Sequence, residues 1–237
     1  MILDELGKMY GTDKVLSENG YTEHYAKVFD PIRHLPLKVL EIGVYNGASI
    51  RMWEAYFPRS KVYGVDNGRI CSPKVMESLR NERVVTEYVD QSNRDDLINF
   101  LEKHGGEFDI IIDDGHHYQE HQQVSWGALF PALKSGGHYI IEDIVLPTKS
   151  MADKPYREGK DELDWSSRWG IKDAKYFSDA TWTVLLEFVN SGNLVSPYMT
   201  DTEKEFIENT IQRNKHEVPD IRIHTKAVAT IAFMRKK

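Results

Sequence analysis

The sequence predicts an α/β fold with a doubly wound sheet that is mostly parallel and has an antiparallel edge strand. From about residue 37, short apolar runs alternate with amphipathic segments, which is the pattern of strand–helix–strand units. One run, Ile110-Ile111-Ile112, is continuously apolar, as expected for a parallel strand covered by helices on both faces. Two extended patterns with a short link close the chain, which favours an antiparallel pair at the sheet edge.

Five strands are expected before the closing pair. They span residues 37–42, 61–65, 83–89, 108–112 and 138–141, with helical patterns between most of them. Residues 48–56 are predicted as the helix after the first strand, and the closing pair spans residues 221–224 and 228–233. The sequence shows no internal repeat, and 237 residues are enough for one substantial core. We therefore expect a single domain over residues 1–237.

Two segments fall outside this alternation. Residues 1–34 form a prelude that we expect to end in an amphipathic helix from about Thr22. Residues 146–179 form a polar insertion after the fifth strand, with Trp165 and Trp169. Ligands bind at the carboxyl ends of strands in doubly wound sheets, so this insertion is placed to act as a lid. The alternative is a surface excursion that its tryptophans pack onto the body.

Composition and charge exclude several classes of protein. Hydrophobic residues make up 41% of the chain and charged residues 28%, which is a globular balance. The formal net charge of −7 argues against nucleic-acid binding. The amino terminus is too charged for a signal peptide, and no stretch approaches the roughly 18 apolar residues of a membrane span. Cys71 is the single cysteine. We expect a cytoplasmic protein without nucleic-acid or membrane partners.

A glycine turn follows the first predicted strand. The segment Glu41-Ile42-Gly43-Val44-Tyr45-Asn46-Gly47 has a G-x-x-x-G spacing, which permits a tight turn and close approach of backbone to a ligand. Tyr45 stands where a dinucleotide fingerprint would have its second glycine, which disfavours an NAD-dependent oxidoreductase. Asp66 follows the second strand, where a carboxylate can accept hydrogen bonds from a ribose diol. These features favour a nucleoside site, with Glu41, Gly43, Gly47 and Asp66 as the predicted cofactor-binding residues.

Further polar residues follow the third strand. Asp90 and Gln91 could meet the edge of an adenine, although Asp90 and Ser92 are also residue types that cap helices. Both readings stay open from the sequence.

Acidic residues end the fourth and fifth strands. Asp113 and Asp114 end the fourth, Glu142 and Asp143 end the fifth, and neighbouring parallel strands share one crevice at their carboxyl ends. Converging carboxylates are tolerated when a divalent cation neutralises them, and oxygen ligands suit Mg²⁺. Helix caps without any metal, or a transition-metal site that uses a histidine, are the alternatives.

A histidine pair, His116-His117, follows the acids of the fourth strand. A cation lowers the pKa of a hydroxyl, and a neutral histidine can then take the proton. His117 is the candidate base, with His116 and His121 as the alternatives.

Taken together, E-x-G-x-x-x-G, Asp66 and the acidic end of the fourth strand resemble class I S-adenosylmethionine-dependent methyltransferases, over about residues 37–145. The resemblance implies a Rossmann-like fold, with Gly43 and Gly47 along the methionine part of the cofactor and Asp66 on its ribose.

Longer strings narrow this resemblance. GTDK at residues 11–14, LEIGVYNG-x-S, DDGHH-x-x-x-HQ and GGHYIIED resemble metal-dependent sugar O-methyltransferases that modify macrolide deoxysugars and related glycans. The resemblance implies Asp114, Glu142 and Asp143 as metal ligands and His117 as base. Where relatives carry D-G-S-H, this chain has a histidine, His116, at the serine position. Thr12-Asp13-Lys14 is expected to fold over the cofactor or the acceptor, and a simple helix-capping turn is the alternative.

The leading functional prediction is transfer of a methyl group from S-adenosylmethionine, assisted by Mg²⁺ or another divalent cation. The acceptor would be a sugar hydroxyl of a nucleotide sugar, a glycosylated natural product, as in antibiotic biosynthesis, or a glycan precursor. One alternative is a catechol-like acceptor, whose diol also chelates Mg²⁺. Another is a non-catalytic nucleoside-binding protein, which would not need a second acidic cluster. The oligomeric state stays open, a homo-oligomer included.

Overall fold

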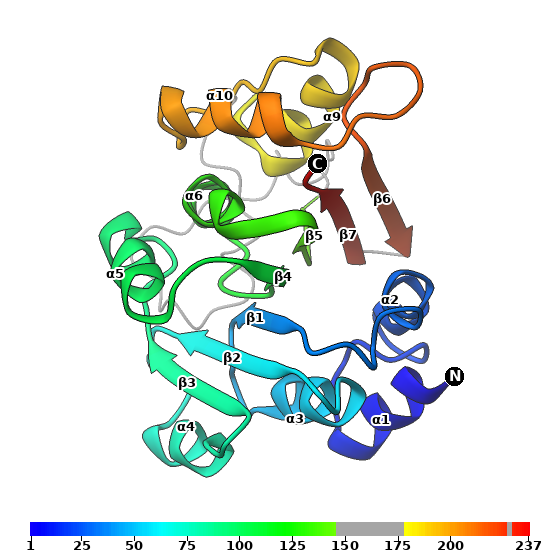
Figure 1. Ribbon diagram of the computed structural model, residues 1–237, viewed down its shortest axis with the longest axis vertical. Coiled ribbons are helices and arrows are strands. Elements are labelled where there is room, and N and C mark those ends of the chain that lie inside the picture. The colour runs from blue at the N-terminus through cyan, green and yellow to red at the C-terminus, as the bar shows by residue number, and fades with distance from the viewer. Residues whose placement is uncertain (146–177, 227–228) are drawn as a thin grey trace, which may run out of the picture.

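The computed structural model describes residues 1–145, 178–226 and 229–237 (Figure 1). Within them, seven strands form one sheet in the order β3-β2-β1-β4-β5-β7-β6. The strands are β1 (Lys38–Ile42), β2 (Lys61–Asp66), β3 (Val84–Tyr88), β4 (Phe108–Asp113), β5 (Leu133–Ile141), β6 (Ile221–Lys226) and β7 (Ala229–Arg235). Strands β1 to β5 pair in parallel, and β7 is antiparallel to both β5 and β6. The predicted sheet, mostly parallel with antiparallel pairing at its edge, is confirmed.

Helices cover both faces of this sheet. They are α1 (Ile2–Tyr10), α2 (Tyr21–Phe29), α3 (Ala48–Tyr56), α4 (Pro73–Leu79), α5 (Arg94–His104), α6 (Gln119–Leu129), α9 (Thr181–Ser191) and α10 (Asp201–Thr210), with a 3₁₀ turn, η1 (Phe130–Ala132). Figure 1 shows α5 and α6 on one side of the sheet and α1, α2 and α3 on the other. Over the described ranges, every helix falls short of the length and apolarity needed to cross a membrane.

Alternate side chains of each strand enter two separate cores. Ile111 of β4 packs with α5, α6 and α9, whereas its neighbours Ile110 and Ile112 pack with α1, α2 and α3. Successive strand residues point to opposite faces, so a strand buried on both sides must be apolar at every position. This requirement explains the continuous isoleucine run, and each such side chain contributes about 1.5–3 kcal/mol on burial.

Local signals explain where several helices begin. The side chain of Asn93 accepts hydrogen bonds from the backbone N–H groups of Asp95 and Asp96, which starts α5. A reciprocal capping box between Thr200 and Glu203 starts α10. The glycine at position 47 has φ +80° and starts α3 directly behind the turn after β1. These caps fix the chain's direction where it leaves the sheet.

Most predicted boundaries agree with the structure within one or two residues, but the fifth strand and the prelude differ. Strand β5 begins at Leu133, five residues before the predicted start, because Gly136 and Gly137 hid the extension from a propensity-based reading. The prelude contains two helices, and the predicted amphipathic helix from Thr22 is α2, which begins at Tyr21. All but the last two residues of the predicted insertion 146–179 lie outside the described residues, and so does the lid prediction.

Candidate active site

A cavity of about 280 Å³ opens at the carboxyl ends of the parallel strands, where the strand order reverses between β1 and β4. Loops after β1 to β5 and the segment between α1 and α2 all contribute to it. The lining includes Gly11, Thr12, Asp13, Gly43, Tyr45, Asp66, Asp90, Gln91, Asp114, His116, His117, His121 and Asp143. Its volume is close to the lower end, roughly 300 Å³, of small-molecule pockets.

The turn after β1 approaches this cavity closely. Gly43 has φ +93°, and a Cβ atom at this position would lie 2.0 Å from the carbonyl oxygen of Asp114, so a side chain cannot be accommodated. Gly47, also predicted to bind cofactor, is absent from the lining and instead shapes the start of α3. Of the two glycines, Gly43 lines the cavity and Gly47 precedes the first residue of α3.

Glu41, the first residue of the E-x-G-x-x-x-G motif, does not border the cavity. Its buried carboxylate accepts hydrogen bonds from Ser49 Oγ at 2.6 Å and from Trp53 Nε1 at 3.0 Å. Burial raises the pKa of Glu41 to about 7, although Lys14 acts in the opposite direction. In this structure Glu41 anchors α3 to β1, and its predicted contact with cofactor stays a prediction.

Asp66 ends β2 and lines the cavity. Its Oδ2 accepts from the backbone N–H groups of Val44 at 2.9 Å and Tyr45 at 3.2 Å, and its Oδ1 accepts from that of Gly68 at 2.8 Å. Each carboxylate oxygen can accept more than one hydrogen bond, so Asp66 retains capacity for a ligand hydroxyl. The same contacts connect the turn after β1 to the end of β2.

The two residues predicted to meet adenine also line the cavity, but their side chains differ in role. Gln91 donates from Nε2 to Asp113 at 2.7 Å and accepts the backbone N–H of His116 at 2.8 Å, so it supports the loop after β4. Asp90 accepts from both the backbone N–H and the hydroxyl of Ser92. Burial raises the pKa of Asp90, but the Ser92 hydrogen bonds and the nearby Arg69 outweigh it and leave the pKa below its usual value. Asp90 therefore offers a carboxylate at the cavity edge.

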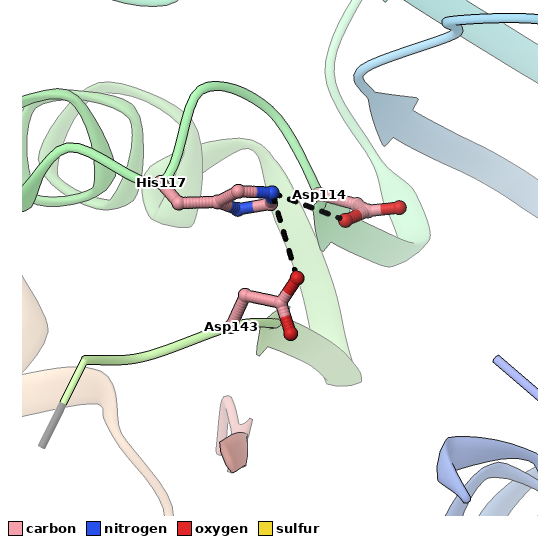
Figure 2. Close-up of side chains that lie close together, drawn as sticks. All are labelled: Asp114, His117 and Asp143. Atoms are coloured by element: carbon pink, nitrogen blue, oxygen red, sulfur yellow. Dashed lines mark ion pairs between the residues drawn. The ribbon is translucent and has the colours of Figure 1, made fainter. Parts of the chain in front are cut away.

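Asp114, His117 and Asp143 gather at the ends of β4 and β5 (Figure 2). Their ligand atoms all lie within 4.8 Å of one another. His117 Nε2 is 3.5 Å from Asp143 Oδ2 and 3.9 Å from Asp114 Oδ1, while His117 Nδ1 is buried without a hydrogen-bond partner. Burial raises the pKa of Asp114 despite the opposing charges of Lys14 and His117. The group has the ligand types and spacing of a cation site.

Backbone strain is concentrated around the same cavity. Five non-glycine residues in the described ranges have positive φ, and three of them, Tyr45 (48°), His117 (58°) and Asp143 (50°), line the cavity. A left-handed conformation costs roughly 1–2 kcal/mol for such residues. Strain of this kind persists where the surrounding structure imposes it, which is common at functional sites.

Glu142 is adjacent to this group but faces a buried lysine. Lys14 Nζ donates to Glu142 Oε2 at 2.7 Å and to Asp114 Oδ2, and it lies 3.7 Å from Glu41 Oε1. Burial alone would lower the pKa of Lys14, but these carboxylates raise it well above its usual value. Tyr25 donates its hydroxyl to the other oxygen of Glu142. The assignment of Glu142 as a metal ligand stays a prediction.

The sequence placed Lys14 in a segment expected to fold over the cofactor or acceptor but assigned it no chemistry, and Tyr21 and Tyr25 were not predicted as members of the site. Lys14 stands in the GTDK string, whose other residues Gly11, Thr12 and Asp13 line the cavity. Periodicity showed only that α2 is amphipathic, so it could not separate core tyrosines from tyrosines that contact carboxylates.

Comparison with known proteins agrees with this geometry. Residues 40–144 match a family described as a methyltransferase domain. The matched range runs from within β1 to the residue after Asp143, so it holds both the glycine turn and the acidic strand ends.

Two similar curated proteins are named as O-methyltransferases. One is an 8-demethyl-8-(2-methoxy-alpha-L-rhamnosyl)-tetracenomycin-C 3'-O-methyltransferase of Streptomyces olivaceus, 37% identical over 149 residues. The other is a mycinamicin VI 2''-O-methyltransferase of Micromonospora griseorubida, 38% identical over 149 residues. Each match covers 60% of this chain but only 36% of the relative. The shared part is therefore about a third of each relative.

A solved structure is similar over the whole chain. It is described as the MycE methyltransferase from the mycinamycin biosynthetic pathway in complex with Mg, SAH and mycinamycin VI. The TM-score is 0.70 at 27% identity, with 100% of this chain and 54% of that chain covered. Residues 40–144 are thus similar to the methyltransferase-domain family, and the Rossmann-like sheet and the cavity at its switch point agree with that similarity.

Proposed function

We propose that this protein is an S-adenosylmethionine-dependent O-methyltransferase that uses a divalent cation and acts on a sugar hydroxyl. One observation carries the proposal. A single cavity is bordered by the glycine turn and Asp66 on one side and by Asp114, His117 and Asp143 on the other. A nucleoside-binding surface and a cation group thus adjoin, as methyl transfer to a cation-activated hydroxyl requires.

The residues around the turn fit a nucleoside cofactor. Gly43 leaves the backbone exposed to a ligand, and the Asp66 carboxylate borders the same space with capacity to accept from a ribose diol. Asp90 adds a second acceptor after β3. SAH, the demethylated product of S-adenosylmethionine, is the ligand named for the similar structure. This agreement supports S-adenosylmethionine as the methyl donor.

The acidic group fits a divalent cation. Asp114 and Asp143 direct one carboxylate oxygen each toward His117, and two such anions close together are stabilised by a bound cation. The two aspartates would hold it, with Glu142 as the further ligand implied by resemblance. When bound, the cation supplies Lewis acidity that makes a hydroxyl of the acceptor easier to deprotonate. Mg is named for the similar structure, which supports magnesium as the cation.

His117 is placed to take the proton of the acceptor. Its Nε2 faces the two carboxylates at 3.5 and 3.9 Å, while its Nδ1 is buried without a hydrogen-bond partner. The acceptor oxygen forms a bond to the methyl carbon while the carbon–sulfur bond breaks, and the electron pair remains on sulfur. The proton passes to His117 Nε2, so a methyl ether and SAH are the products.

The acceptor class follows the relatives. Two of them are named for acceptors that carry a rhamnosyl or an olivosyl group, which are sugars on polyketide scaffolds. We therefore propose a glycosylated natural product as the acceptor for this chain, ahead of a nucleotide sugar or a glycan precursor. We propose further that residues 1–237 form one functional domain.

The test is methyl transfer by the purified chain with S-adenosylmethionine, Mg²⁺ and a panel of glycosylated macrolides, nucleotide sugars and a catechol. SAH release and a mass increase of one methyl group on a sugar-bearing acceptor are expected. A chelator should stop the reaction and added Mg²⁺ should restore it. Methylation of the catechol alone would replace the sugar assignment. Tight NAD binding without S-adenosylmethionine binding would overturn the proposal.

A further inference from the structure

The prelude contacts the acidic strand ends through three side chains that we name the N-terminal clamp: Lys14, Tyr21 and Tyr25. Tyr21 donates its hydroxyl to Asp143 Oδ1 at 2.6 Å, and Tyr25 donates to Glu142. Lys14 donates to both Asp114 and Glu142. All three side chains are almost fully buried. These contacts reach across more than 90 residues of sequence, so the fold of the prelude is what brings them to the site.

The clamp binds one carboxylate oxygen of each aspartate, and the other oxygen faces His117. Asp114 gives Oδ2 to Lys14 and turns Oδ1 toward His117. Asp143 gives Oδ1 to Tyr21 and turns Oδ2 toward His117. A carboxylate that is free at both oxygens can rotate about its terminal torsion, whereas one held at a single oxygen presents the other in a fixed direction. Two fixed oxygens therefore point at the same place.

The charges of the clamp suit this task. Tyr21 and Tyr25 act as neutral donors, since burial first and then the neighbouring carboxylates raise the pKa of both hydroxyls. Lys14 is the one clamp residue with a charge, and it faces three carboxylates, those of Glu41, Asp114 and Glu142. Burial raises the pKa of these three carboxyl groups and the charge of Lys14 opposes that rise, so Lys14 favours the ionised form that a cation would bind.

We infer that Lys14 and Tyr21 are positioning residues, which orient Asp114 and Asp143 so that one oxygen of each is offered to a divalent cation. The inference rests on the proposed function, because it assigns a task to the clamp only if a cation binds the aspartates. Hydrogen-bond partners that orient metal ligands typically change metal affinity by about 10- to 100-fold when they are removed. The clamp should therefore act on cation affinity and leave the nucleoside side of the cavity unchanged.

Tyr21→Phe is the first test, and Tyr56→Phe is its matched control. Tyr56 is buried and donates its hydroxyl to Asp30 Oδ1 at 2.6 Å, so both variants remove one partly buried tyrosine–aspartate hydrogen bond. Mn²⁺ is the probe, and its affinity is measured from the electron paramagnetic resonance signal of the free ion. The affinity for SAH is measured by calorimetry. Tyr21→Phe should weaken Mn²⁺ binding about 10- to 100-fold with SAH binding unchanged, and Tyr56→Phe should change neither.

The variant Lys14→Met tests whether Lys14 affects cation binding by orienting Asp114 or only through its positive charge. If Lys14 acted only by repelling an incoming cation, its removal would strengthen Mn²⁺ binding. If Lys14 positions Asp114, binding weakens. Stronger or equal binding by Lys14→Met would overturn the assignment of Lys14. Tyr21→Phe keeps the inference testable if Lys14→Met does not fold.

The remaining outcomes are distinct. Equal Mn²⁺ affinity for Tyr21→Phe, Tyr56→Phe and the unmodified protein would overturn the positioning role while the cation-dependent function stands. An unmodified protein that binds no Mn²⁺, with SAH bound or without it, would overturn the cation part of the proposed function and the inference together.

Discussion

Gly43 and Asp114 pack so closely that a Cβ atom on Gly43 would lie 2.0 Å from the Asp114 carbonyl oxygen. The first belongs to the turn after β1 and the second to the loop after β4, which are neighbouring strands in the sheet. The side of the cavity that we propose for the nucleoside and the side that we propose for the cation therefore touch through backbone. In the proposed function, this contact would hold the methyl donor next to the acceptor.

Gly43→Ala should damage both sides of the cavity. Its φ of +93° is unfavourable for alanine, and the new methyl group would force the turn and the loop apart. We expect a loss of about 3 kcal/mol or more in the free energy of unfolding, with weaker SAH binding in calorimetry. Gly11→Ala is the control, since Gly11 has φ +77° but no atom within 4 Å of its Cβ position, so it should lose only about 1 kcal/mol. Equal losses would refute the packing argument.

Asp66→Ala should weaken binding of SAH by roughly 1–3 kcal/mol, or about 5- to 150-fold in dissociation constant. The reason is the loss of charge-assisted hydrogen bonds to the ribose and of the contacts that Asp66 makes with Val44 and Tyr45. Calorimetry measures the affinity. Asp201→Ala, at a fully exposed aspartate on α10, serves as the control and should bind normally. Unchanged affinity for Asp66→Ala would remove it from the cofactor site.

Much of the fold could be predicted because strand periodicity shows where each strand ends. Asp66 ends β2, Asp114 follows β4 and Asp143 follows β5 by two residues, and parallel strands bring these positions to one edge. The cavity lining includes all three, together with Gly43 and His117. The sequence pattern therefore predicts where each of these side chains lies along the sheet.

The partners of those side chains could not be predicted in the same way. Nothing in local periodicity relates Lys14 to Asp114, which is 100 residues away. The direction of a carboxylate depends on such tertiary contacts, and so Glu142 and Asp143, adjacent in sequence, have different partners in Lys14 and Tyr21. Gln91 is similar, since the sequence showed an amide after β3 but not that Asp113 and His116 engage it.

His138 should make stability depend on pH. Burial lowers its pKa to about 4, and the charges of Arg235 and Arg222 act in the same direction. In the unfolded chain a histidine has a pKa of about 6.5, so between about pH 6.5 and 4 the unfolded state binds the proton and the folded state does not. The free energy of unfolding should therefore fall as pH is lowered through this range, by about 3.4 kcal/mol from this residue at most.

Urea unfolding at pH 7 and at pH 4.5 tests this expectation. His138→Gln should lose part of the pH dependence, because glutamine does not titrate. His34→Gln should keep it, since His34 is exposed. His24 and His224, whose pKa values burial also lowers, contribute in the same direction and remain in both variants. The same pH dependence in His138→Gln as in the unmodified protein would contradict the prediction.

Asp143→Asn should cost activity far more than cofactor affinity. Asp143 directs Oδ2 toward His117 and gives Oδ1 to Tyr21, so it belongs to the cation side of the cavity. An amide is a weaker cation ligand than a carboxylate. We expect Mn²⁺ binding and turnover to fall together while SAH binding stays within about twofold, a small change in free energy. Loss of SAH binding with Mn²⁺ binding intact would place Asp143 on the nucleoside side.

His117→Ala decides whether this histidine is a base or a cation ligand. As a base it takes the acceptor proton at Nε2, so its removal should lower the rate of methyl transfer by about 10² to 10⁴ while Mn²⁺ affinity is unchanged. As a ligand it belongs with Asp114 and Asp143, whose nearest oxygens lie 3.9 and 3.5 Å from that nitrogen, and its removal would weaken Mn²⁺ binding as well. His116→Ala and His121→Ala test the other histidines of the cavity and should retain most of the rate. Added imidazole should restore part of the activity of His117→Ala only if a proton acceptor is what the variant lacks, because a free base can replace a lost side chain without rebuilding the cation site.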